Sequence, residues 1–204
     1  MSKIVSKEVQ EFVENNLNGE FFKRNVLGPY SAYKILDITL SADAVDKDMY
    51  KKFSEDEKMK MKEENNRAEA EEDINKLYNM LRKKIYPSTF FIIVNKLMKH
   101  KDVIFRKMLG DFKRSGNDYF VEAAARILVK AEDNYSNEIA SMLPYIKYPY
   151  TQAIACYVLG KIGREEHIKI LYEYFNKLKN NYEREAFYEG PLFGLYEMKR
   201  RFEF

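Results

Sequence analysis

The stretch YTQAIACYVLGKIG, residues 150–163, decides how this chain folds. Its small and apolar residues recur at spacings close to i, i+3, i+4 and i+7, which mark one face of an α-helix. These residues are Ala153, Ala155, Leu159 and Ile162. Pro149 stands where a first helical residue is expected, and Gly163 stands where a helix should stop. The stretch therefore predicts one helix that begins at Pro149 and ends before Gly163.

A second helix is predicted immediately after this one. Its apolar face is formed by Ile168, Leu171, Tyr172, Phe175 and Leu178. Two helices joined by so short a turn form an antiparallel hairpin, and small residues on the first helix allow its neighbour to approach closely. Four residues are therefore expected to be buried against one another: Ala155, Leu159, Leu171 and Phe175.

An earlier segment repeats the pattern at an offset of 31 residues. Leu128 corresponds to Leu159, and Ala124 corresponds to Ala155. A partner helix follows again, with the apolar residues Ile139, Met142, Leu143 and Ile146. A helix pair that recurs at a fixed period is typical of a helical solenoid.

The motif AxAxxxLGxIG at residues 153–163, followed by IxxL at 168–171, resembles a HEAT or HEAT-like repeat. The resemblance covers roughly residues 118–202 and is best at 149–178. It implies an all-α fold, a right-handed α-solenoid of antiparallel helix pairs. A repeat of this kind describes a fold and not an activity.

The first region, residues 1–53, is predicted to be helical. Four short helices are expected, over about 5–17, 21–27, 30–40 and 45–53. Asp43 is the expected cap of the last one.

One long charged helix is predicted for the second region, residues 54–86. Ser54-Glu-Asp-Glu57 matches a capping box, and the helical pattern continues to about Ile85. The first half, residues 54–69, has almost no apolar stripe. A helix that is polar on all sides has little to bury, so this half is expected to protrude or to be mobile.

The third region, residues 87–204, is expected to hold the HEAT-like repeats and to form one continuous domain with the other two. Helices over 88–99 and 102–114 form a degenerate first pair. The last element is expected from about residue 181, with a bend at 188–191, because Gly190-Pro191 lies in its middle.

Composition excludes several classes of protein. The chain has 204 residues, of which 46% are hydrophobic and 33% charged, so it is expected to fold. A single Cys excludes an internal disulfide framework. No apolar run reaches the length of a membrane span, and the first residues lack a signal-peptide core. A cytoplasmic location is therefore expected.

No catalytic residues, cofactor or metal site are predicted, and the sequence does not indicate an enzyme. His100 and His167 have no metal-ligand spacing and are expected at the surface. Cys156 lies in an alanine-rich helix and is expected to be a small buried thiol. Paired catalytic carboxylates that come together only on folding remain an open alternative.

Positive charge is concentrated in one block, residues 82–114. The block contains ten Lys and Arg and two Asp, a net +8, although the whole chain carries only +3. Three neighbouring elements are therefore expected to form one basic surface. The tyrosines at one inter-helix turn, Tyr145, Tyr148 and Tyr150, are interpreted either as rings packed at the edge of the core or as a partner-binding ridge. The alternative is a solvated face, partly neutralised by the acidic stretch 55–73. The candidate partner-binding residues are Arg82, Lys83, Lys96, Lys99, Arg106, Lys107, Lys113, Arg114, Tyr145 and Tyr148.

Two functions are consistent with this pattern. The first is a protein-protein interaction module, as a scaffold, adaptor or immunity-type binder, whose partner has an acidic surface. The alternative is a HEAT-like nucleic-acid-binding protein that uses the basic block. The alkylpurine DNA glycosylases are a similar HEAT-like class that cradles a duplex on a basic face. That class relies on a tryptophan near the lesion, and this chain has 0 Trp, so none of its functional residues is carried over.

Overall fold

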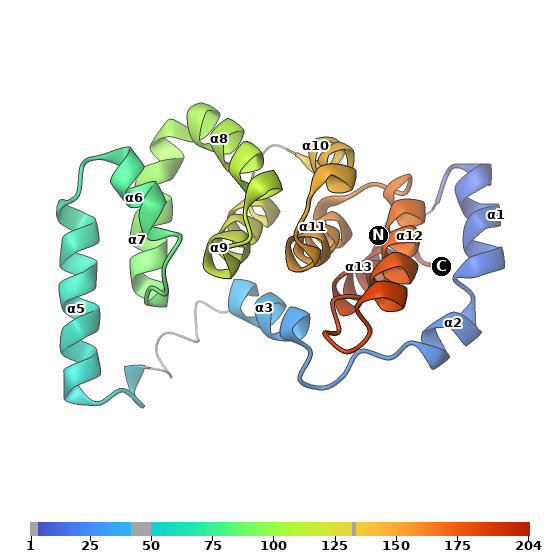
Figure 1. Ribbon diagram of the computed structural model, residues 1–204, viewed down its shortest axis with the longest axis horizontal. Coiled ribbons are helices and arrows are strands. Elements are labelled where there is room, and N and C mark those ends of the chain that lie inside the picture. Colours follow the sequence, from blue (N-terminus) through green and yellow to red (C-terminus); the bar gives the residue numbers. More distant parts are fainter. Residues whose placement is uncertain (1–3, 42–49, 132–133) are drawn as a thin grey trace.

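The computed structural model describes residues 4–41, 50–131 and 134–204. Within these ranges the secondary structure is helical and contains no strand, so the predicted all-α class is confirmed (Figure 1). Most of the helix predicted over 45–53, with its cap Asp43, lies outside the described residues. Among the described helices, none has both the length and the apolar composition that a membrane span requires.

Three helices lie side by side, with α11 in contact with both others. They are α9 (Asp118–Val129), α11 (Pro149–Ile162) and α13 (Glu189–Phe202). Pro149 is the first residue of α11 and Gly163 its C-cap, as the sequence predicts. A Cβ atom added to Gly160 would lie 2.3 Å from Cα of Gly194, so α11 and α13 are in backbone contact.

A second group of helices packs onto these three. It consists of α8 (Lys101–Arg114), α10 (Ser136–Met142) and α12 (His167–Asn181), with the 3-10 turns η1 (Met98–His100) and η2 (Leu143–Tyr145). In this arrangement α8 contacts α9, α10 contacts α11, and α12 contacts both α11 and α13. The four residues expected in the core are all buried: Ala155, Leu159, Leu171 and Phe175.

The prediction of one long helix to Ile85 is wrong. Two helices replace it, α5 (Glu55–Ala70) and α6 (Ile74–Met80). The capping box at Ser54 is present, but Glu71 has extended backbone angles, and the side chain of Asp73 accepts hydrogen bonds from two backbone N–H groups and starts a new helix. The chain therefore turns at residues 71–73.

The polar helix α5 packs against α7 (Pro87–Leu97). Ala68 is fully buried, and the side-chain oxygen of Asn65 accepts hydrogen bonds from Ser88 at 3.1 Å and from Thr89 at 2.7 Å. One face of residues 54–69 is thus attached to the rest of the molecule by polar contacts. The mobility expected for this stretch stays a prediction.

The predicted bend inside the last helix is also wrong. Helix α12 continues to Asn181, turns follow, and α13 begins at Glu189, so Gly190 and Pro191 lie in the first turn of a new helix. Proline is tolerated there because the first backbone N–H groups of a helix have no intrahelical acceptor. The apolar face of α13 is fully buried, with Leu192, Leu195 and Met198 in the core.

The N-terminal helices return to the C-terminal end of the chain (Figure 1). They are α1 (Lys7–Asn16), α2 (Gly19–Arg24) and α3 (Ala32–Ser41). Aromatic pairs hold the first two: the ring centroids of Phe12 and Tyr172 are 5.5 Å apart, and those of Phe22 and Tyr196 are 4.9 Å apart. Helix α3 then runs across to contact α13.

Candidate functional site

Helix α8 presents the basic block because its apolar residues face inward. Its buried residues are Ile104, Phe105, Met108 and Phe112. At 3.6 residues per turn, Lys107 and Arg114 lie along one edge of this apolar face, and Lys113 lies near the opposite edge. The two edges therefore meet different neighbours.

Three of the candidate cations surround one carboxylate, Asp111. Its oxygens lie 2.9 Å from Arg82 Nη2, 3.6 Å from Lys107 Nζ and 3.4 Å from Arg114 Nη2. The hydroxyl of the buried Tyr78 also donates to Asp111 at 3.1 Å. Burial, and then the charge of Asp111, raises the pKa of Tyr78, so this donor keeps its proton. Three positive charges around one negative charge leave a local excess of two.

Aromatic rings fix two of these cations in place. The Arg82 guanidinium lies 4.4 Å from the centroid of the Phe120 ring, and Lys107 Nζ lies 4.9 Å from that of Tyr78. Cation–ring attraction adds to the ion pairs with Asp111. Arg82 and Lys107 are therefore held in defined positions.

The other edge of α8 carries a lysine beside exposed tyrosines. Lys113 Nζ lies 4.4 Å from the ring centroid of Tyr145, which is 67% exposed. Tyr148, 47% exposed, covers Gly116, where an added Cβ would lie 2.7 Å from the Tyr148 ring. Gly116 thus allows the ring to lie against the turn between α8 and α9. We define the α8 surface as Arg82, Lys107, Lys113, Arg114, Tyr145 and Tyr148.

The remaining predicted residues do not join this cluster. Lys96 Nζ donates to the backbone oxygens of Glu69 and Glu71 and lies 3.3 Å from the Glu72 carboxylate. This position stabilises the end of α5, because its last carbonyl groups have no partner within the helix. The other three, Lys83, Lys99 and Arg106, are exposed; Lys83 follows Arg82, Lys99 lies in η1, and Arg106 lies in α8 itself.

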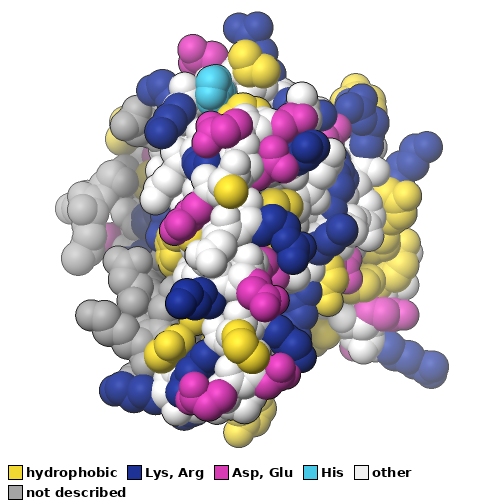
Figure 2. Space-filling view, turned by 90° about the vertical axis from the view of Figure 1, so that its left-hand side faces the viewer, with side chains coloured by type: hydrophobic (Ala, Val, Ile, Leu, Met, Phe, Trp, Pro, Cys, Tyr) yellow, Lys and Arg dark blue, Asp and Glu magenta, His cyan; other side chains and the backbone are white. Residues whose placement is uncertain are grey.

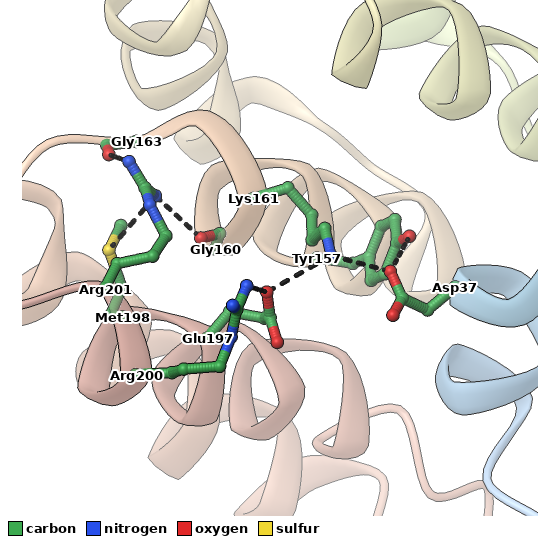
Figure 3. A network of polar contacts seen from close by, with 9 residues as sticks. All are labelled: Asp37, Tyr157, Gly160, Lys161, Gly163, Glu197, Met198, Arg200 and Arg201. Atoms are coloured by element: carbon green, nitrogen blue, oxygen red, sulfur yellow. Dashed lines mark hydrogen bonds and ion pairs between the residues drawn. The ribbon is translucent and has the colours of Figure 1, made fainter. Parts of the chain in front are cut away.

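A second polar cluster, which the sequence does not predict, connects α3, α11 and α13 (Figure 3). Lys161 Nζ lies 2.7 Å from Asp37 and 3.1 Å from Glu197. The hydroxyl of Tyr157 donates to Asp37 at 3.2 Å, and Arg200 lies 2.9 Å from Glu197. Burial alone would raise the pKa of Glu197, but the bond from Arg200 and the charge of Lys161 outweigh it and lower that pKa.

This second cluster balances two acids with two bases, so it has no excess charge to attract a ligand. Its described members all have partners inside the molecule. Beside it, Arg201 donates to the backbone oxygens of Gly160 at 2.9 Å and Gly163 at 2.7 Å, which caps the end of α11 (Figure 3). We interpret these contacts as the attachment of α3 and α13 to α11.

The structure corrects one prediction about the histidines. His100 is exposed as expected, but His167 is buried, and its Nδ1 accepts a hydrogen bond from the backbone N–H of Arg164 at 2.9 Å. Burial lowers the pKa of His167. Cys156 is buried as predicted, and burial raises the pKa of its thiol. In the part of the chain that the structure describes, no three His, Cys, Asp or Glu residues are grouped to hold a metal ion.

Comparisons of the chain with protein-family models, with curated proteins and with solved structures found no match. The function of this chain is therefore inferred from its own residues. Of the two clusters described above, the α8 surface has excess charge and exposed aromatic rings, and the cluster around Lys161 has its charges balanced.

Proposed function

We propose that this chain is a protein-protein interaction module on a HEAT-like solenoid, and that it binds the acidic surface of a partner protein through the α8 surface. The observation that carries the proposal is the group of three cations around Asp111 on one edge of α8, with Lys113 and the exposed ring of Tyr145 on the other edge. The α8 surface therefore carries both excess positive charge and exposed aromatic rings.

The solenoid part of the proposal is supported by the packing of the repeat-like segments. Leu128 and Leu159, which correspond at the 31-residue offset, are both fully buried, and so are Ala124 and Ala155. The helices that carry them, α9 and α11, contact each other, and each also contacts a helix of the second group. Equivalent residues in equivalent surroundings are what a repeat architecture requires.

Interface physics favours a protein as the partner. Tyr and Arg are the residue types that most often dominate the binding energy of protein interfaces. Arg82 is already held by Asp111 and by Phe120, so binding would cost little of its side-chain entropy.

A nucleic-acid backbone would need a continuous positive surface, and two observations disfavour one. Lys96 points to the end of α5, and Asp111 places a negative charge among the cations. On the face at the α5 end of the molecule, Lys and Arg side chains are interspersed with Asp and Glu (Figure 2). Phosphate binding depends on the number of cations that contact the backbone, so this mixture weakens it.

The proposal is tested by the binding of two labelled probes to the full chain, measured by fluorescence anisotropy. One probe is a peptide of alternating Glu and Tyr, and the other is a short DNA duplex. At about 50 mM salt we expect the peptide to bind. The double variant Lys107→Glu with Lys113→Glu should lower the affinity for the peptide about tenfold, mainly through slower association. The matched control, Lys62→Glu with Lys169→Glu, reverses two exposed lysines elsewhere and should leave the affinity within about twofold.

Two results would contradict the proposal. Equal losses in the two double variants would mean that the peptide responds only to net charge. Duplex binding that is tighter than peptide binding, falls steeply with salt and is lost in the α8 variant would replace the protein partner with nucleic acid.

A further inference from the structure

Helix α3 lies on the face formed by α11 and α13 (Figure 1). Two of its side chains are buried there, Tyr33 and Leu36, and the rings of Tyr33 and Tyr157 are 6.5 Å apart. Asp37, one residue further, reaches Lys161 at 2.7 Å. Residues i, i+3 and i+4 share one face of a helix, so α3 presents an aromatic ring, a leucine and an acid together.

The face beneath α3 is built without it. Helices α11 and α13 are in backbone contact at Gly160 and Gly194, which fixes their distance. Lys161 is also held by Glu197, and Glu197 by Arg200, so this lysine keeps a partner when Asp37 is absent. The face should therefore keep its shape after α3 leaves.

The chain before α3 is anchored separately. The Tyr196 hydroxyl donates to the backbone oxygens of Phe22 at 3.1 Å and Asn25 at 3.0 Å, and Lys179 donates to the Asn25 side chain at 2.9 Å. These bonds end at Asn25, seven residues before the start of α3 at Ala32. Helix α3 can therefore detach without the release of α1 and α2.

Two features oppose the docking of α3. It is a helix of 10 residues, shorter than the length at which helices are stable alone. The buried hydroxyl of Ser31 finds no hydrogen-bond partner among the described residues, which opposes docking. Apolar side chains are exposed on the other side of the segment, with Tyr30 at 88% and Ile35 at 52%.

We propose that α3 is a displaceable internal competitor, and that the face beneath it binds an amphipathic helix of a partner protein. The partner helix would carry an aromatic residue, a leucine three positions later and an acid in the next position, matching Tyr33, Leu36 and Asp37. The aromatic and leucine side chains enter the sites on α11 and α13, and the acid pairs with Lys161. This is the helix-in-groove mode of recognition, with α3 raising the threshold for binding.

The test uses a fluorescein-labelled peptide with the sequence of residues 30–41 and the full chain. The variant Tyr33→Ala with Leu36→Ala weakens α3 and leaves every residue of the receiving face unchanged. We expect this variant to bind the peptide at least about tenfold more tightly than the unmodified chain, because the internal competitor is weakened. The control Ile35→Ala, on the exposed side of α3, should match the unmodified chain. Unlabelled peptide carrying Leu36→Ala should not compete.

Three results would overturn the inference. The first is an equal affinity of the unmodified chain and the variant for the peptide. The second is no binding of the peptide to the variant at about 1 mM peptide. The third is a dimer of the unmodified chain in which two copies exchange α3. If the weakened variant does not fold, hydrogen exchange of the unmodified chain decides. Amides of α3 that exchange about a hundredfold faster than those of α11 support the inference, and equal rates overturn it. The face used here is separate from the α8 surface, so failure of this test leaves the acidic-partner proposal standing.

Discussion

Gly160→Ala tests the backbone contact between α11 and α13. The new Cβ would lie 2.3 Å from Cα and 2.9 Å from the carbonyl oxygen of Gly194. Both atoms belong to the backbone, so no side chain can rotate away, and the two helices must separate. Overpacking of this kind costs about 1–3 kcal/mol. Alanine also favours a helix over glycine by about 1 kcal/mol, so a net loss of up to about 2 kcal/mol is expected.

Gly110→Ala is the matched control. It makes the same substitution inside α8, where the nearest atom to the new Cβ is Arg114 Nη2 at 3.6 Å. Here only the helix propensity changes, so the free energy of unfolding should rise by about 0.5–1 kcal/mol. The two variants should therefore shift in opposite directions.

Urea unfolding followed by circular dichroism at 222 nm measures both effects. With a slope of about 2 kcal/mol per molar urea, the midpoints of the two variants should differ by about 1 M. If the two alanines stabilised the chain equally, the prediction would be contradicted, because α11 and α13 would then not be in backbone contact.

Three further predictions follow from the packing. Leu159→Ala should lower the free energy of unfolding by about 2–5 kcal/mol, and a loss below about 0.5 kcal/mol in urea unfolding would place Leu159 at the surface. Burial lowers the pKa of His167 in the folded state from its ordinary value of 6.5. The unfolded chain therefore binds more protons than the folded chain once the pH falls below about 6.5, so the free energy of unfolding should decrease as the pH drops below that value. His167→Gln should flatten this dependence in urea titrations at several pH values, and an unchanged slope would contradict it. Asn65→Ala removes the acceptor for Ser88 and Thr89 and should speed hydrogen exchange in residues 55–70 by about tenfold, whereas unchanged rates would show that these bonds do not hold α5.

The hairpin at 149–178 was predictable from sequence because its signals are local. Pro149 and Gly163 mark the two ends of one helix, and the small residues between them indicate a closely packed neighbour. The burial of Leu159 and Leu171 could therefore be predicted. The end of α5 was missed for the opposite reason. Residues 55–85 read as one charged helical pattern, and only the capping of α6 by Asp73 shows the turn.

The contacts that position both clusters join residues far apart in the chain. Asp37, Lys161 and Glu197 come from three separate helices, and no local pattern connects them. In the basic block, the sequence identified Arg82, Lys107 and Arg114 as neighbours of one surface, but it did not show that Asp111 lies among them.

Photo-crosslinking in the cells from which the chain comes shows whether the α8 surface binds an acidic protein. A benzophenone amino acid replaces Tyr145 in one variant. In a control variant it replaces Met59, which lies on α5 and is 60% exposed. We expect position 145 to crosslink to an acidic segment of one protein and position 59 not to do so. Lys107→Glu with Lys113→Glu should remove the crosslink. Crosslinks from position 145 to nucleic acid, or to the same proteins as from position 59, would contradict the proposal.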